Sequence, residues 1–299
     1  MPLMDRRTKD RAIKGFFFIA AASCILVLFL IMLFLFIEGV PIFQKVGVFD
    51  FIFGTEWYPT YDPPDYGIFP LIIGTLAVTA LSSAMAIPLG VMTAIYLAEI
   101  ARPSVRNVLK PTVEMLEALP SVVIGFFGMV VVAPLLQRLF PDVYTGLNLF
   151  NASLMLAFMA VPTITSIAED AIYSVSDELR EASLALGANQ WQTIGKVIIP
   201  ASLSGITTAV ILGMARSIGE TMVVLMVAGG AAMIPLSIFD PVRPMPASIA
   251  AEMAEAPVRS DHYYALFATG MVLFLFTLAF NFVAAYVAEK KKQVGTATL

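Results

Sequence analysis

The chain has 299 residues, of which 59% are hydrophobic and only 13% are charged, and its mean hydropathy is +0.86. A soluble domain carries about 25% charged residues, so an ordinary water-exposed surface is excluded. The formal net charge of −4 gives no indication of a polyanionic partner, and we expect no nucleic-acid partner. One cysteine and one histidine exclude an intrachain disulfide and a metal cluster built from these residues, so no metal site is expected.

Six apolar stretches are long enough to cross the hydrocarbon core of a bilayer, which takes about 20 helical residues. The first follows a basic segment but is too long for the apolar region of a cleavable signal, so we expect an uncleaved anchor. Backbone groups must be satisfied internally in lipid, so the sequence predicts an all-α polytopic membrane protein. The predicted spans are 15–37, 69–97, 112–136, 152–168, 203–228 and 264–287.

The distribution of basic residues sets the expected orientation. With six spans, the N-terminal tail, the loops 98–111 and 169–202, and the C-terminal tail share one side. These segments hold thirteen of the 18 Lys and Arg residues, and the loops on the other side hold four. Because Lys and Arg collect in cytoplasmic segments, both termini are predicted to be cytoplasmic. The aromatic segment around Trp57 is then external, where such rings favour the membrane interface.

Two acidic residues, Glu114 and Glu117, lie near the cytoplasmic end of the third span. Arg106 and Lys110 precede them at helical spacing. We interpret the acids as interfacial residues that pair with these juxtamembrane bases.

The loop 169–202 has the pattern of two short helices. Ser176 followed by two acids is typical of a helix start, and Gly187 is typical of a helix stop. A second short helix is predicted over 190–199, with Pro200 at the entry to the fifth span. Small and apolar residues recur at helical spacing before the stop: Leu179, Ala182, Ser183 and Leu186. A solvated amphipathic loop and a docking element for a partner both fit this pattern.

The fifth predicted span contains an arginine and a glutamate four residues apart. Arg216 falls near the middle of 203–228, and Glu220 would follow one turn later on the same helical face. A charge at the bilayer centre costs at least about 2.5–3.5 kcal/mol, so Arg216 must face protein or water. An ion pair that only joins helices is one interpretation. The other is a binding station for an oxyanion, because a guanidinium matches its oxygens and Glu220 would balance the charge when it leaves.

Two features beyond this pair lie on the external side. The Ala-rich segment 247–256 predicts a short helix, either a connector or a contact for a solute-binding protein. His262 beside two tyrosines is interpreted as an interfacial anchor.

No G-x-x-x-x-G-K-[ST] phosphate loop occurs, so the chain is not expected to hydrolyse ATP by that route. We therefore expect a transport protein that is not an enzyme. If it pumps, another chain supplies the energy.

The long loop resembles the EAA loop of ABC-importer permeases. That pattern is E-A-A, three residues, G, nine residues, I, one residue, L-P. This sequence matches it with three conservative departures, at Ser183, Val197 and Ile199. In that family the loop forms a coupling helix that sits in a groove of the ATPase subunit. The resemblance implies that the ATPase contact comprises Glu181, Ala182, Ser183 and Gly187.

The segment 216–221, R-S-I-G-E-T, resembles the signature of permeases from phosphate-specific importers. Four further segments are similar to the PstC subunits of these importers: 54–59, 66–76, 94–99 and 119–128. The resemblance covers about residues 15–290 in the family's order. It implies that phosphate translocation uses Arg216, Ser217, Glu220 and Thr221. It also implies a gate at Leu119, Pro120 and Ser121, although a proline there is also an ordinary helix-bending device.

The resemblance implies a MetI-like permease core in the bacterial cytoplasmic membrane. Residues 1–65 would form an N-terminal tail, an extra helix and an external loop, followed by the core at 66–288 and a basic tail at 289–299. The expected partners are a PstA-like permease, two PstB-like ATPase subunits, a PstS-like phosphate-binding protein and membrane lipid. No cofactor is expected in this chain, because ATP and Mg²⁺ would bind the partner ATPase.

Three alternatives stay open at this stage. A permease for another oxyanion, such as molybdate or sulfate, fits the same charge and shape. A stand-alone secondary transporter would use Arg216 and Glu220 as an ion-coupling pair, but no internal inverted repeat is visible and the EAA pattern would have no role. A membrane signalling scaffold is a third class.

Overall fold

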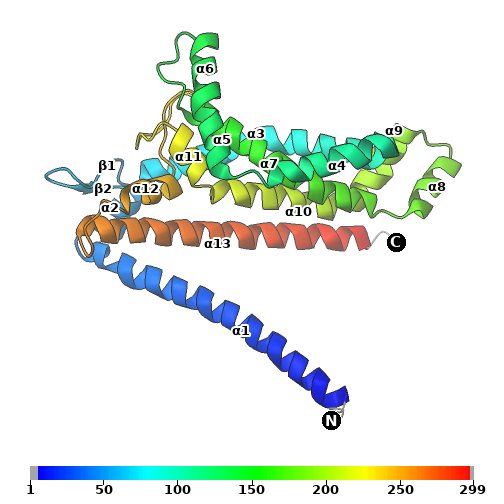
Figure 1. The fold of residues 1–299 in the computed structure, drawn as a ribbon, viewed down its shortest axis with the longest axis horizontal. Helices are drawn as coiled ribbons and strands as arrows, with labels where there is room; N and C mark the ends of the chain where they lie inside the picture. Colours follow the sequence, from blue (N-terminus) through cyan, green and yellow to red (C-terminus); the bar gives the residue numbers. More distant parts are fainter. Residues whose placement is uncertain (1–5, 297–299) are drawn as a thin grey trace.

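The computed structural model describes residues 6–296, which are mostly helical (Figure 1). Within this range six helical segments are long and apolar enough to span a membrane. They are Ile13–Gln44, Phe69–Ile100, Ser121–Leu139, Leu149–Tyr173, Gln190–Ile218 and Asp261–Tyr286. The predicted all-α polytopic class and the number of spans are confirmed.

The first helix is set apart from the rest. Helix α1 (Arg6–Gly39) diverges from the bundle and contacts α13 (Asp261–Thr296) near one end (Figure 1). The two backbones approach closely there, because a Cβ on Gly39 would lie 3.1 Å from the backbone nitrogen of Ala268. An external segment follows α1 and contains η1 (Val40–Gln44), α2 (Val48–Phe53) and a hairpin of β1 (Trp57–Tyr58) paired antiparallel with β2 (Asp65–Tyr66).

The centre of the molecule is three packed helices. Helix α7 (Leu149–Tyr173) lies between α3 (Phe69–Ile95) and α10 (Ile199–Ile218). Ile164 of α7 lies where a Cβ on Gly90 or on Gly213 would clash, so small residues on both neighbours permit the close approach.

The remaining elements join and cap this centre. They are η2 (Tyr96–Ile100), α4 (Pro103–Glu117), α5 (Ser121–Phe127), η3 (Gly128–Val132), α6 (Ala133–Leu139), α8 (Asp177–Ala185), α9 (Gln190–Thr193), η4 (Ile194–Ile198), α11 (Met222–Val227) and α12 (Met245–Glu252). The elements η2, η3 and η4 are π-helical turns that continue the helices around them.

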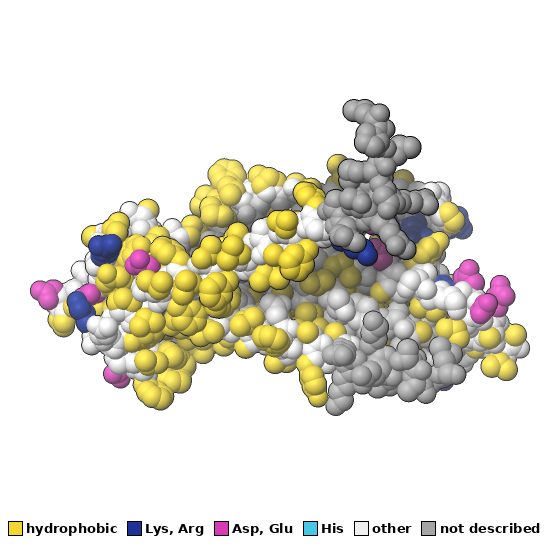
Figure 2. Space-filling model, turned by 90° about the horizontal axis from the view of Figure 1, so that it is seen from below, with side chains coloured by type: hydrophobic (Ala, Val, Ile, Leu, Met, Phe, Trp, Pro, Cys, Tyr) yellow, Lys and Arg dark blue, Asp and Glu magenta, His cyan; other side chains and the backbone are white. Residues whose placement is uncertain are grey.

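The two ends of the molecule differ as the charge distribution predicts. Helices α8 and α9 lie at the end where both chain termini point, and the hairpin, α2 and α12 lie at the other end (Figure 1). Apolar side chains cover the middle of the visible face, and most visible charges gather toward the ends (Figure 2). This arrangement fits a protein that crosses a bilayer along its long axis.

Three predicted spans need correction. The third begins at Ser121 and not at 112, because the amphipathic α4 ends at Glu117 and the chain bends before Pro120. The fifth begins within the cytoplasmic loop and ends at Ile218, so 203–228 is not one helix. The fourth, expected to be short, runs over Leu149–Tyr173; its lower hydropathy reflects burial in protein instead of contact with lipid.

Candidate functional site

Arg216 lies in the last turn of α10, and not in the middle of a span as predicted. A basic side chain at a helix C-terminus interacts favourably with the exposed carbonyl groups of the helix end. The chain then passes through Gly219, the residue at the C-cap, and turns into the short helix α11.

The guanidinium of Arg216 contacts two other helices. Its Nη1 donates to Glu117 Oε1 on α4 and to Thr163 Oγ1 on α7, each at 3.1 Å. The Thr163 hydroxyl also donates to Glu117 Oε1 at 2.8 Å, which closes a triangle of three side chains. Three helices therefore meet at one partly exposed arginine.

Glu220 does not pair with Arg216, which corrects the predicted one-turn pair. The helix ends between the two residues, so they do not share a helical face. Glu220 Oε1 instead accepts from the backbone nitrogens of Met222 and Val223, at 3.2 and 3.3 Å, and caps α11. The prediction that Glu117 pairs with Arg106 or Lys110 is also wrong. Glu117 pairs instead with Arg216, which lies 99 positions later in the chain.

Three of the four predicted translocation residues lie around one crevice, and Thr221 is not among the residues that line it. Arg216, Ser217 and Glu220 line it together with apolar residues of α7, and it is too narrow here for a water-sized sphere. The buried Ser217 donates to the carbonyl of Gly213 at 3.2 Å, and Thr221 donates to the carbonyl of Gly219 at 3.3 Å. These two hydroxyls bond their own backbone, so Arg216 supplies the group in this crevice with unused donors.

The segment Leu119–Ser121 forms the bend between α4 and α5. Pro120 is extended (φ −61°, ψ 135°) and Ser121 begins α5. The bend follows directly after Glu117, so it adjoins the Arg216 triangle. A gating role for this bend stays a prediction.

The predicted coupling element forms at the cytoplasmic tip. Helix α8 begins after Ser176 and none of its residues is buried. Gly187 adopts φ +85°, a conformation that favours glycine, as its predicted role as a stop requires. The second predicted helix is not separate, because α9, η4 and α10 continue through Pro200.

The tip presents apolar side chains to its surroundings. Leu186 is 90% exposed and Trp191 is 69% exposed. Among the predicted contact residues, Glu181 and Ala182 are exposed, whereas Ser183 is half-buried and bonds Thr193 at 2.9 Å. Arg180 pairs with Glu99 at 2.6 Å and fixes the tip to the end of the second span.

A buried carboxylate on α7 was missed in the sequence. Glu169 is fully buried and bonds both Arg106 and Lys110 of α4. Burial by itself lowers the pKa of Lys110, but hydrogen bonds to Asp170 and Glu169 outweigh it and raise that pKa above its usual 10.5. The spacing of the two bases indicated a polar face on α4, but no local signal gave a partner some 60 positions away.

A second missed cluster lies on the external side. Glu252 of α12 accepts from Trp57 Nε1, Arg243 and Ser248, and lies 2.8 Å from His262 Nε2. A carboxylate only accepts, so His262 donates from Nε2. His262 and Trp57 are therefore buried in an external polar core, which corrects their prediction as interfacial anchors. The predicted helix within 247–256 is present as the first part of that segment.

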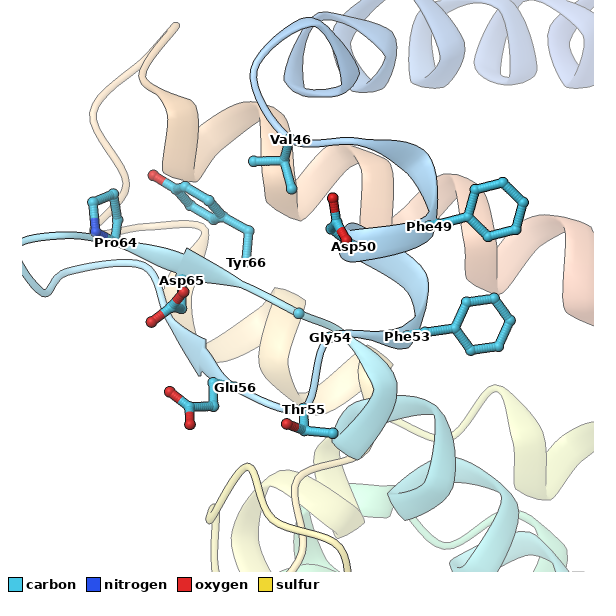
Figure 3. A pocket seen from close by; sticks show the side chains of 11 residues that line it. Val46, Phe49, Asp50, Phe53, Gly54, Thr55, Glu56, Pro64, Asp65 and Tyr66 are labelled. Carbon is cyan, nitrogen blue, oxygen red and sulfur yellow. The ribbon is translucent and has the colours of Figure 1, made fainter.

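Two cavities lie at the external end, and the second is lined partly by residues of this cluster. One, of about 510 Å³, lies between α2 and the hairpin and is lined by Asp50, Glu56 and Asp65, with Phe49 and Phe53 projecting side by side (Figure 3). No basic residue lines it, so it repels an anion. The other, of about 500 Å³, contains Arg243, whose charge Glu252 already neutralises. Neither cavity competes with Arg216 as an anion site.

Six helices able to cross a membrane, an exposed helical tip at the cytoplasmic end and an arginine at an internal crevice are together the features of a membrane permease. The chain belongs to the family of binding-protein-dependent transport system inner membrane components, whose model matches residues 86–293. It is the permease subunit of an ABC transporter and a multi-pass protein of the inner membrane. Permeases of this family work with ATPase and substrate-binding partners.

Curated relatives extend over most of the chain. A probable ABC transporter permease, YqgH of Bacillus subtilis, is 39% identical over 264 residues, which are 88% of this chain and 85% of the relative. The phosphate transport system permease PstC of Mesorhizobium japonicum is 33% identical and covers 81% of this chain and 80% of its own. PstC of Pasteurella multocida is 32% identical, over 77% of this chain and 76% of its own.

Solved structures support the fold alone. The alginate ABC transporter aligns with a TM-score of 0.67 over 95% of this chain and 96% of its own, at 15% identity. The inward-facing MetNI methionine transporter aligns with a TM-score of 0.58 over 73% of this chain and 93% of its own, at 19% identity. These similarities confirm the predicted MetI-like core.

Proposed function

We propose that the chain conducts inorganic phosphate across the inner membrane as the PstC-type subunit of an ATP-driven importer. The observation that carries this proposal is the guanidinium of Arg216, which adjoins an internal crevice and uses only one nitrogen in the contacts described above. Its remaining N–H groups can bind the oxygens of a tetrahedral anion. The PstC names of several relatives support phosphate as that anion.

The proposed assembly follows from the same family. A PstA-like permease would complete the pathway, a PstS-like protein would deliver phosphate, and two PstB-like subunits would bind ATP and Mg²⁺. Glu181, Ala182, Ser183 and Gly187 would contact an ATPase subunit, because the exposed tip at α8 presents apolar side chains on the cytoplasmic side. The bend at Leu119–Ser121 would act as the gate. This chain would bind no cofactor.

A second candidate is a permease for another oxyanion, such as molybdate or sulfate. A guanidinium binds these anions by the same contacts, so geometry alone does not favour phosphate. The names of the relatives favour phosphate, and a competition experiment separates the two. Membership of the ABC permease family removes the stand-alone secondary transporter.

The test is uptake of radiolabelled phosphate by the complete complex reconstituted in proteoliposomes. Arg216→Ala should lower uptake by about tenfold or more, since charge-assisted hydrogen bonds contribute roughly 1.5–3 kcal/mol. Arg138→Ala, on the external helix α6, removes the same charge away from the crevice and should transport normally. Wild-type uptake by Arg216→Ala would refute the site, and strong inhibition by excess sulfate or molybdate would favour the second candidate.

A further inference from the structure

Glu117 is the residue that neutralises Arg216 in this structure. It is the last residue of α4, and its carboxylate lies 3.1 Å from Arg216 Nη1. The R-S-I-G-E-T signature contains a different glutamate, Glu220, which bonds backbone nitrogens of α11 instead. The counter-charge of the arginine therefore comes from another helix, 99 positions away in the chain.

The contact has the geometry of a replaceable ligand. Only Oε1 of the carboxylate and only Nη1 of the guanidinium take part, so the pair is not the two-bond arrangement that holds arginine most firmly. The side chains of Arg216 and Glu117 are 32% and 38% exposed, so this chain does not enclose either of them. A carboxylate oxygen and a phosphate oxygen are both anionic hydrogen-bond acceptors, so either can accept a hydrogen bond from Arg216 Nη1.

The Glu117 carboxylate lies at the end of α4, so loss of its contact with Arg216 can allow that end of the helix to move. Helix α4 has no buried residue, and its described side chains are joined to α7 and α10 by polar contacts. Glu117 is the polar contact next to the bend at Ala118–Pro120, whereas Arg106 and Lys110 hold the opposite half of the helix. Breaking the Arg216 contact therefore leaves the end of α4 beside the crevice with the Thr163 hydrogen bond alone, while ion pairs keep the other end attached.

We propose that Glu117 is the resident counter-anion of Arg216, which an incoming oxyanion displaces and whose return expels that anion. This inference rests on the proposed function, because it assumes that Arg216 binds the transported anion. Binding of phosphate to Arg216 then loosens the end of α4, and the re-formed pair limits how long the anion stays. A site that exchanges its ligand in this way binds weakly enough to conduct.

Glu117→Gln tests the competition directly, with Glu114→Gln as a matched control. Glu114 lies one turn earlier on α4, is exposed, and makes no ion pair or side-chain hydrogen bond with the side chains that the structure describes. Both variants remove one negative charge, so a general electrostatic effect would appear in both. The measurement is the broadening of the ³¹P NMR line of inorganic phosphate as the purified complex is added. The broadening caused by the Arg216→Ala complex is subtracted, because it does not come from the proposed site.

Glu117→Gln should tighten phosphate binding by roughly two- to fivefold, the range for losing a partly exposed ion-pair competitor. Its maximal uptake rate should fall, because no carboxylate returns to release the anion. Glu114→Gln should match wild type in both measurements. Equal affinities for the two variants, or weaker binding by Glu117→Gln, would overturn the counter-anion proposal.

Thr163→Val provides a second route if Glu117→Gln does not assemble. The Thr163 hydroxyl donates to Glu117 at 2.8 Å and orients the carboxylate, so its loss should also tighten phosphate binding, by a smaller factor. An affinity equal to or below wild type would contradict the proposal. If Arg216→Ala leaves the line broadening unchanged, the proposed function's site fails; if only the Glu117 effect is missing, that site stands and the counter-anion alone is refuted.

Discussion

At the scale of residues, ion pairs between helices dominate the cytoplasmic half of the bundle. Glu169 of α7 is fully buried and has two cationic partners on α4. A buried carboxylate is tolerated only when its charge is matched, and both bases lose a partner if it is removed. Arg106 also lies 3.8 Å above the ring of Tyr173, which adds a cation–π contact to the same joint.

We expect Glu169→Ala to destabilise the protein by roughly 3–5 kcal/mol, the range for breaking a buried pair from one side. The midpoint of thermal unfolding of the purified complex, followed by tryptophan fluorescence, measures this. Asp170→Asn is the control, because Asp170 is 70% exposed and an exposed pair contributes about 0–1 kcal/mol. Equal midpoints for the two variants would contradict the assigned role of Glu169.

The pH dependence of this joint follows from Lys110. Its pKa in the folded protein is raised above the usual 10.5, so its contribution is complete below that value and is lost as the pH rises through the folded pKa. We therefore expect no loss of this contact at neutral pH.

Sequence reasoning identified Arg216 but not its partner, for a physical reason. A helical repeat relates residues three or four positions apart, so it pointed to Glu220. That rule requires a continuous helix, and the chain ends one at Gly219. The pairing with Glu117 depends on how α4 packs beside α7 and α10, which no local spacing encodes.

At the scale of elements, the cytoplasmic tip was the most predictable part. A helix start at Ser176, a stop at Gly187 and exposure of the intervening face all follow from local chemistry, and the structure has each of them. The π-helical turn η4 was not predictable, because it arises where a continuous helix passes from the loop into the bundle. Pro120 indicated a bend before α5. The apolar residues on both sides of this bend, however, made the end of α4 hard to recognise in the sequence.

Substitution of Gly187 tests the proposed docking role of the cytoplasmic tip without placing a side chain against other residues of this chain. A Cβ there would meet nothing within 4 Å, so Gly187→Ala costs only backbone strain at φ +85°, about 1–2 kcal/mol. We expect less ATPase subunit to co-purify with the permease and uptake to fall in proportion. Gly195→Ala, also with open space but in the π-helical turn η4 with no left-handed φ, should behave as wild type. Full co-purification with Gly187→Ala would argue against docking through this turn.

At the scale of the whole molecule, apolar length and the distribution of basic residues were enough to predict six spans and their orientation. Apolar length and the distribution of basic residues are both summed over many positions, so an error in one span boundary changes the prediction little. The division at residue 66 between an N-terminal part and the core stays a prediction. What the sequence did not indicate is that α7, the least hydropathic span, is the most buried one.

Orientation can be measured with a membrane-impermeant maleimide in a Cys24→Ser background, since Cys24 is the only cysteine of the chain. Tyr144→Cys, at a residue 98% exposed, should react in cells whose outer barrier alone is opened. Leu186→Cys, at a residue 90% exposed, should react only after the inner membrane is permeabilised. The reverse pattern would invert the assigned topology.

The four side chains around Glu252 have a mechanical consequence. They come from the hairpin, from the segment before α12, from α12 itself and from the start of α13, so one carboxylate joins parts that are far apart in sequence. The Glu252 side chain is only 15% exposed, so separating it from Arg243 would leave a largely enclosed carboxylate without its cationic partner, which is costly. We therefore expect these four segments to move together as one rigid unit when the pathway opens outward.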